Sequence, residues 1–342
     1  MWDLAPKKIH LGLQGAGVYG AYTWGVLDRL LDEENLVIDS LSGSSSGAIN
    51  AAVLADGYAR GGGRRGAQQA LRRFWTGLGQ AASLSPLQRT PLDHLAGNWT
   101  MEYSPTYHML EMSGVLNGPV AEVPFTRNPL RHLLSLLIDF DRVRACEELQ
   151  LFVAATNVRT GGGRIFTRDE LDVQKLLASA CLPTVFAAVE VDGETYWDGS
   201  YVANPPLVPF LQRPADDMII VQNNPIARAQ LPRSMADIGN RANEIAFNIS
   251  FQRELNALLH GQGLPDEKGG AGMQFGQPRV HLISGTDMLS EYSISSKMNG
   301  EPGFLQHLHA RGFAAASEWL ERHADQIGVG STLDPSAVFC EA

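Results

Sequence analysis

Short apolar runs alternate with helix-forming stretches along most of the chain. The apolar runs predict strands at 9–13, 36–41, 149–156, 164–167, 218–221 and 279–283. Apolar residues at helical spacing predict helices at 26–31, 48–55, 68–78, 173–181, 235–260 and 308–323. Because strands that alternate with helices pair in parallel, this order predicts an α/β fold. We expect a mostly parallel central sheet flanked by helices on both faces.

One domain over residues 7–325 fits this pattern, with three segments that stand apart from the alternation. Residues 81–129 lose the period and gain Pro, Ser and Asn, so they fit either a lid or binding loop or an irregular surface insertion. Apolar residues scattered through this segment include Met109, Leu110 and Met112. The long helix at 235–262 fits a helical cap over an acyl pocket, and residues 326–342 fit a C-terminal tail.

Composition and charge limit the partners that the chain can bind. The 342 residues are 44% hydrophobic and carry a formal net charge of −10. This charge gives no footing on nucleic acid or on an anionic bilayer, so we expect at most transient membrane-surface contact through apolar groups. The three cysteines, Cys146, Cys181 and Cys340, form no C-x-x-C pair. No apolar run is long enough to span a bilayer and the N-terminus lacks a signal-like apolar region, which together predict a cytoplasmic protein.

A G-x-S-x-G motif, residues 43–47, joins the second predicted strand to a predicted helix. In this context a sharp turn lifts its central residue, Ser45, into an exposed position beside backbone N–H groups. A side chain at Gly43 or Gly47 would collide with the neighbouring strand or helix. Ser45 is therefore the first candidate for a nucleophile, and an ordinary strand-to-helix turn is the alternative.

A second glycine motif, Gly-Ala-Gly-Val-Tyr-Gly at 15–20, follows the first predicted strand. With Asp39 near the end of the second strand it fits a dinucleotide-binding fold, so an NAD-type oxidoreductase is a rival interpretation. Against that rival, the second strand runs past Asp39 into the serine turn. The N–H groups of Ala16 and Gly17 could instead hold the negative charge that develops near Ser45 during acyl transfer, and plain packing glycines are the third alternative.

A serine nucleophile needs a group that takes its proton. None of the nine histidines lies in a glycine-flanked loop at an obvious strand end. Asp198 follows a short predicted strand and precedes Gly199, and a buried carboxylate in such a turn can act as the base directly. Asp192, followed by Gly193, fits a hairpin turn with a structural role.

Three motifs in this order resemble the patatin-like phospholipase family: residues 15–20, residues 43–47 and Asp198-Gly199-Ser200. The helix end at 178–183 and Asn204-Pro205 add to the resemblance, which covers about residues 9 to 222. It implies a patatin-like fold and a Ser45–Asp198 dyad that cleaves lipid acyl esters through an acyl-enzyme, without metal or organic cofactor. The glycine-loop residues that it assigns to an oxyanion hole are Gly15, Ala16, Gly17 and Gly20, and its motif glycines are Gly43, Gly47 and Gly199.

Two departures from the family pattern affect the substrate that this resemblance implies. The family commonly has Arg or Lys at the position of Tyr19, and Gly or Ala at the position of Ser200. Because Tyr19 brings no cation, the case for a phosphate-bearing substrate is weaker. Phospholipid, lysophospholipid, glyceride and simple ester all stay open as substrates.

Two other functions stay open at this stage. Ser45, Asp198 and His281 keep the chain order of a Ser-Asp-His triad in an ordinary α/β-hydrolase, with His260 as another candidate base. That fold normally places its serine turn after more strands than the two predicted here. A non-catalytic acyl-binding or regulatory module that retains the scaffold is the alternative from outside the enzymes.

Overall fold

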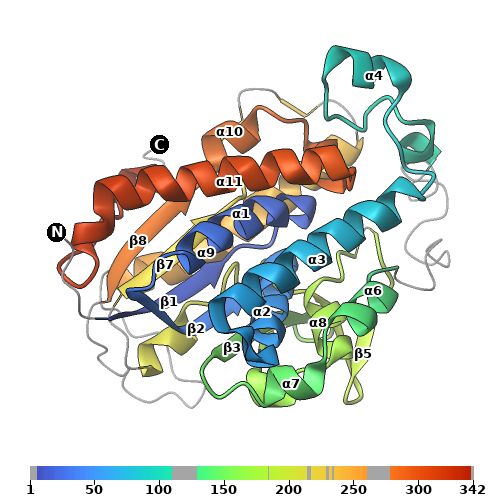
Figure 1. Cartoon of the computed structure of the whole chain (residues 1–342). Coiled ribbons are helices and arrows are strands. Elements are labelled where there is room, and N and C mark those ends of the chain that lie inside the picture. The colour runs from blue at the N-terminus through green and yellow to red at the C-terminus, as the bar shows by residue number, and fades with distance from the viewer. Residues whose placement is uncertain are drawn as a thin grey trace.

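The structure is a computed structural model that describes residues 6–109, 129–183, 185–213, 217–228, 231–232, 235–259 and 278–339. Within these residues, eight strands form one sheet (Figure 1). The strands are β1 (Lys7–Leu13), β2 (Leu36–Gly43), β3 (Gln150–Asn157), β4 (Gly163–Thr167), β5 (Val189–Val191), β6 (Glu194–Asp198), β7 (Asp217–Gln222) and β8 (Arg279–Ser284).

The sheet is parallel through its centre and antiparallel at one edge. Its strand order is β5-β6-β3-β2-β1-β7-β8, and β4 pairs with β3 beside this path. The pairs β3–β2, β2–β1, β1–β7 and β7–β8 are parallel, whereas β4 and β6 pair with β3, and β5 with β6, in the antiparallel sense. The predicted fold class, a mostly parallel sheet flanked by helices, is confirmed.

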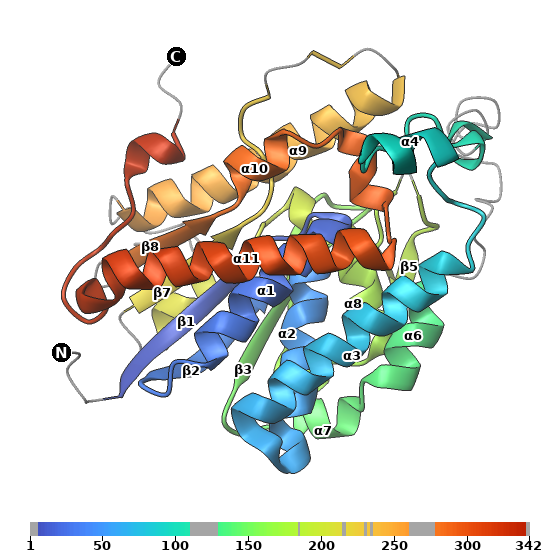
Figure 2. The same ribbon diagram turned by 45° about the horizontal axis from the view of Figure 1, so that its top comes forward.

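Helices cover both faces of this sheet, and the side chains of β7 show the two faces directly. Ile219 and Val221 pack with the larger core, which includes residues of α1, α2, α3 and α11. Met218 and Ile220 point to a second core with Phe251 of α9. The helices are α1 (Gly20–Leu31), α2 (Ser46–Gly57), α3 (Gly63–Ser83), α4 (Pro91–Ala96), α6 (Pro129–Leu137), α7 (Phe140–Arg144), α8 (Val173–Ser179), α9 (Met235–Leu259), α10 (Thr286–Ser290) and α11 (Pro302–His323). Figure 2 shows α1 and α11 running side by side over the sheet.

Four helices, α1, α2, α3 and α11, begin earlier than the apolar pattern predicts, and the starts of α3 and α11 have clear local causes. Helix α3 starts at Gly63 directly after a π turn at Tyr58–Gly62, so the glycine cluster 61–63 is the joint between two helices and not an open loop. Positive φ angles of 99° at Gly61 and 51° at Gly63 produce this joint. Helix α11 starts at Pro302, where proline fits the first turn because its missing N–H would have no helical acceptor.

The segment 81–129 contains more regular structure than its composition predicts. Its first residues complete α3, and α4 follows with a capping box between Thr90 and Asp93. Farther along, the Met101 N–H donates to Ser295 Oγ at 3.0 Å. Met109 is 71% exposed, while Leu110 and Met112 lie outside the described residues.

The expected C-terminal tail packs on the sheet edge as far as residue 339. The N–H groups of Thr332 and Leu333 donate to the Val280 carbonyl of β8. Ile327 and Val338 are fully buried. Among the described helices, none combines the length and the apolar character needed to cross a bilayer.

Candidate active site

Ser45 lies at the joint between β2 and α2, in a conformation that few side chains adopt. Its φ of 52° and ψ of −124° are outside the ordinary allowed regions for a residue with a Cβ. The turn is as tight as predicted, because a Cβ on Gly47 would strike the Leu13 carbonyl of β1 and a Cβ on Gly43 would lie 2.5 Å from the Ala48 nitrogen. Ser45 is half-buried, so one side of the elbow stays open.

The Ser45 backbone is held by the end of α8. Its N–H donates to Ser179, to the carbonyl at 3.2 Å and to Oγ at 3.0 Å. The next residue, Ser46, begins α2, so the serine sits at the amino end of a helix. The local helix dipole there favours negative charge.

Asp198 is the last residue of β6 and reaches Ser45 across the sheet. It lies opposite Ala155 of β3, and a Cβ on the following Gly199 would strike the Ala154 carbonyl, so the turn packs directly on β3. The Asp198 side chain is buried, and its Oδ1 accepts the Ser200 N–H at 2.9 Å. Burial raises the pKa of Asp198 to about 6, although hydrogen bonds from Ser200 and from the Ser45 hydroxyl act in the opposite direction.

The glycine loop 15–20 lies against the same serine. A Cβ on Gly15 would be 2.6 Å from the Ser45 Cβ, and one on Gly20 would be 2.7 Å from the Ser46 Cβ. Gly17 has a φ of 60°, which a side chain would strain. The Ala16 N–H donates to Ser46 Oγ at 3.1 Å. The three predicted motifs therefore meet at one place, at the carboxyl ends of β1, β2 and β6.

His281, the predicted alternative base, does not belong to this group. It is fully buried in β8, which is separated from β2 by β7 and β1. Its Nε2 contacts Asp217 Oδ1 at 3.0 Å and its Nδ1 contacts Thr332 Oγ1 at 3.0 Å. Both ring nitrogens are thus engaged far from Ser45. His260 lies outside the described residues.

The two remaining carboxylates singled out in the sequence have structural positions. Asp192 is exposed in the hairpin between β5 and β6, with a φ of 52°, as the hairpin prediction requires. Asp39 is 8% exposed and pairs with Arg213 Nε at 3.1 Å. The Asp39 carboxylate is therefore engaged in an ion pair with an arginine. In a dinucleotide-binding fold the corresponding acid is free to bind a ribose. No group of described His, Cys, Asp and Glu side chains is arranged to hold a metal ion.

The sequence named Asn204 only as part of the family resemblance and did not single out Asn224, and the structure shows what both do. Asn204 Oδ1 accepts the Gly15 N–H at 2.7 Å, and Asn224 Nδ2 donates to the Gly15 carbonyl at 2.6 Å. A usable signal for Asn224 was its place directly after β7, since polar residues at the carboxyl ends of parallel strands gather at one edge. Ser46 lies in the motif at 43–47 and Ser179 in the helix end at 178–183, but the sequence assigned neither serine a role of its own, because serine is common in turns and helix ends.

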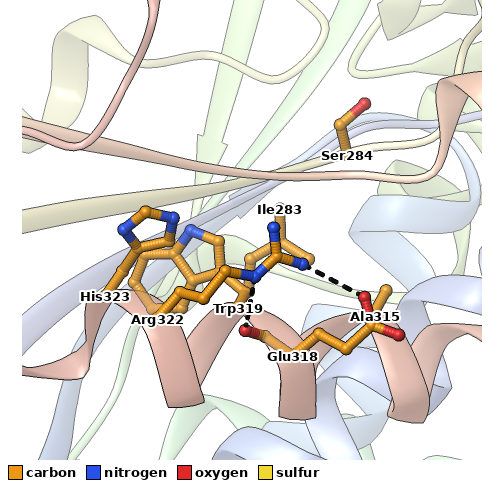
Figure 3. A pocket seen from close by; sticks show the side chains of 7 residues that line it. All are labelled: Ile283, Ser284, Ala315, Glu318, Trp319, Arg322 and His323. Atoms are coloured by element: carbon orange, nitrogen blue, oxygen red, sulfur yellow. Dashed lines mark hydrogen bonds and ion pairs between the residues drawn. The ribbon is translucent and has the colours of Figure 1, made fainter.

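A pocket of about 140 Å³ lies elsewhere, between β8 and α11 (Figure 3). Its lining residues are Ile283, Ser284, Ala315, Glu318, Trp319, Arg322 and His323. Arg322 pairs at 3.1 Å with Glu318, which lies one turn earlier on α11. None of these residues surrounds Ser45, so the pocket belongs to a different part of the molecule.

The protein is therefore an α/β protein with a mostly parallel sheet and a serine at a strained turn between a strand and a helix. The family model for patatin-like phospholipases matches residues 11–211, and the chain belongs to this family. Membership supports a lipid hydrolase function. No curated protein matches the sequence.

Among solved structures, the chain is similar to bacterial effector proteins. VipD from Legionella pneumophila is 13% identical with a TM-score of 0.43, and the match covers 93% of this chain and 67% of VipD. ExoU from Pseudomonas aeruginosa, in its heterodimeric complex with SpcU, is 18% identical with a TM-score of 0.37, covering 93% of this chain and 52% of that chain. The chain thus spans about half the length of the ExoU chain it matches.

Proposed function

We propose that the protein is a serine hydrolase that cleaves carboxylic ester bonds of lipids through a Ser45–Asp198 dyad. One observation carries this proposal: a strained, half-buried serine donates its hydroxyl to a buried carboxylate whose pKa is raised to about 6. A carboxylate with a pKa near neutrality is ionised at pH 7 and still basic enough to accept a proton. A serine with such a partner is an activated nucleophile.

The first half of the reaction forms an acyl-enzyme. Ser45 Oγ attacks the carbonyl carbon of the ester while its proton passes to the Asp198 carboxylate. The carbonyl oxygen becomes an oxyanion, which then collapses and expels the alcohol with the proton held by Asp198. Asp198 is again ionised, and the acyl group is bound to Ser45.

The second half releases the acid. Asp198 takes a proton from a water molecule that attacks the acyl carbon, and the second oxyanion collapses with return of that proton to Ser45 Oγ. In both halves the oxyanion would accept hydrogen bonds from the N–H groups of Ala16 and Gly17. The Ala16 N–H now donates to Ser46 Oγ at 3.1 Å, so the oxyanion would replace this hydroxyl as acceptor.

Turnover of a p-nitrophenyl ester by the Ser45→Ala variant tests this proposal. We expect activity to fall below a few per cent of wild type with the melting temperature preserved, because the glycines and Ser179 hold the turn. Retained turnover would remove Ser45 from the nucleophile role. Wild-type protein without ester turnover would favour the acyl-binding or regulatory module.

A further inference from the structure

A buried group of charges lies beside the glycine loop, although residues 15–20 themselves carry no charge. At its centre lies Glu244 of α9, which is 1% exposed. Glu244 forms ion pairs with three cationic side chains: Lys297 at 2.8 Å, Arg228 at 2.7 Å and Arg241 at 3.0 Å. We call these four residues the Glu244 cluster.

The ionisation of this cluster follows from its contacts. Burial raises the pKa of Glu244, but Lys297 and Arg228 outweigh burial and bring it to about 2, so Glu244 is ionised at neutral pH. Burial lowers the pKa of Lys297, and the contact with Glu244 acts against that shift. Arg228 also donates to the carbonyls of Ser290 and Tyr292, which fixes the cluster between α9 and the segment after α10.

Two hydrogen bonds connect Lys297 to the glycine loop. Lys297 Nζ donates to Asn224 Oδ1 at 3.2 Å, and Asn224 Nδ2 donates to the Gly15 carbonyl at 2.6 Å. Asn224 is fully buried. An ammonium group can only donate and a carbonyl can only accept, so these contacts allow just one orientation of the Asn224 amide.

The Gly15 carbonyl in turn sets the direction of the next N–H group. Asn204 Nδ2 donates to the same carbonyl at 3.2 Å, on the side of Asn224. The carbonyl and the N–H of one trans peptide point in opposite directions, so the Ala16 N–H is directed away from both asparagines. It points to Ser46 Oγ, beside Ser45.

Lys297 also contacts the loop through its own backbone. A Cβ on Gly17 would lie 2.8 Å from the Lys297 carbonyl oxygen, and Lys297 Nζ lies 5.6 Å from the centre of the Tyr19 ring. The 3-10 helix Ile294–Met298, which carries Lys297, therefore packs on both ends of the loop segment 17–19. The cation is held against the loop by main chain and side chain together.

We propose that Lys297 and Asn224 are positioning residues for ester hydrolysis. Asn224 fixes the Gly15–Ala16 peptide so that the Ala16 N–H faces the oxyanion. Lys297 fixes the orientation of the Asn224 amide by donating to its oxygen, which leaves the amide nitrogen to donate to the Gly15 carbonyl. This inference rests on the proposed function of Ser45.

The test compares kcat and KM of a soluble p-nitrophenyl ester for Lys297→Met and Asn224→Ala. We expect kcat to fall about tenfold or more in each variant while KM changes less than about twofold, because the oxyanion exists only in the transition state. In the Lys297→Met/Asn224→Ala double variant the loss should equal that of the slower single variant, since both residues act through one peptide.

Lys8→Met is the matched control, because it removes the same charge from the start of β1, where the side chain is 56% exposed. We expect wild-type kinetics from it. An unchanged kcat in folded Lys297→Met, a wild-type kcat in Asn224→Ala, or losses that multiply in the double variant would each overturn the inference. Should Lys297→Met fail to fold, a wild-type kcat in Asn224→Ala still overturns the inference.

The wild type and Ser45→Ala, assayed in parallel, separate this inference from the proposed function. Turnover that is absent from the wild type, or independent of Ser45, overturns the proposed function and the inference with it. Turnover that depends on Ser45 but is insensitive to Lys297 and Asn224 overturns the inference alone.

Discussion

At the scale of single residues, the account depends on a buried carboxylate next to a strained serine. Asp198 is 3% exposed, and its burial outweighs the hydrogen bonds that favour the charged form. An ordinary surface aspartate would be a much weaker base, because its pKa lies near 4. Burial at the end of β6 is thus what makes a direct Ser–Asp pair chemically reasonable.

The pH dependence of kcat/KM should report this carboxylate. The base acts when ionised, and its pKa is raised to about 6, so kcat/KM should rise with pH through about 6 and then level off. Asp198→Asn should reduce kcat by on the order of 10³-fold or more. Asp192→Asn is the control and should be nearly neutral, because Asp192 is exposed in a hairpin that tolerates asparagine. Equal effects of the two substitutions would argue against Asp198.

His281 provides the opposite case, a buried ionisable residue with a structural role. Its contacts with Asp217 and Thr332, each at 3.0 Å, connect β8 to β7 and to the C-terminal segment. His281→Ala should therefore lower the free energy of unfolding by about 2–4 kcal/mol, from lost hydrogen bonds and a cavity. Ester turnover by the folded variant should stay within about tenfold of wild type. Near-zero turnover with intact folding would transfer the base role to this histidine.

At the scale of helices and strands, the sequence predicted the features that depend on local pattern and missed most of those that depend on long-range packing. The six apolar runs all appear as strands, and the serine turn appears between β2 and α2, because both signals are local. Of the antiparallel edge the sequence predicted only the hairpin at Asp192-Gly193, which joins β5 to β6. The strand order was not predictable, since pairing depends on residues far apart in the chain. Distance along the chain also hid Lys297, which lies 280 positions after Gly17. Asn224 lies 209 positions after Gly15, and its place directly after β7 was its one usable signal.

Helix α4 presents exposed leucines on the side of the molecule toward which β1 runs (Figures 1 and 2). Leu92 is 75% and Leu95 is 86% exposed. The segment after α4 reaches the glycine loop through the 3-10 helix Ile294–Met298, where Ser295 accepts the Met101 N–H and Ser296 contacts the Tyr19 hydroxyl. Exposed apolar groups on the helix before this segment suit contact with a lipid surface.

The Leu92→Ser/Leu95→Ser variant tests that contact. We expect hydrolysis of a lipid ester presented in vesicles to fall severalfold while turnover of a soluble short-chain ester is unchanged, because only the first requires surface contact. Val329→Ser is the control, since Val329 is 71% exposed but follows the far end of α11. A proportional loss on both substrates would indicate general destabilisation.

At the scale of the whole molecule, two cores on opposite faces of the sheet share the stability. Beside the second core, the half-buried Glu254 of α9 accepts the N–H of the core residue Leu207 at 2.5 Å. Burial raises the pKa of Glu254 to about 7. A raised carboxyl pKa contributes stability that is fully present below the unfolded value near 4.5 and is lost as pH rises through about 7.

Glu254→Gln should remove this pH dependence. The amide keeps an acceptor for the Leu207 N–H and does not ionise, so the wild type should lose melting temperature relative to the variant between pH 5 and pH 8. Asp198, whose pKa is also raised, adds a slope of the same sign to both proteins and cancels in the difference. A difference in melting temperature between the two proteins that stays constant from pH 5 to pH 8 would contradict the prediction.

The most direct test of the central claim is covalent labelling of the folded protein by a fluorophosphonate, read by mass spectrometry of its peptides. The reagent modifies only an activated serine. We predict a single adduct on Ser45 in the wild type, an adduct that forms orders of magnitude more slowly in Asp198→Asn, and none in Ser45→Ala. A folded wild-type protein that gains no adduct at Ser45, or an Asp198→Asn variant labelled at the wild-type rate, would contradict the assignment of Ser45 and Asp198 as a catalytic pair.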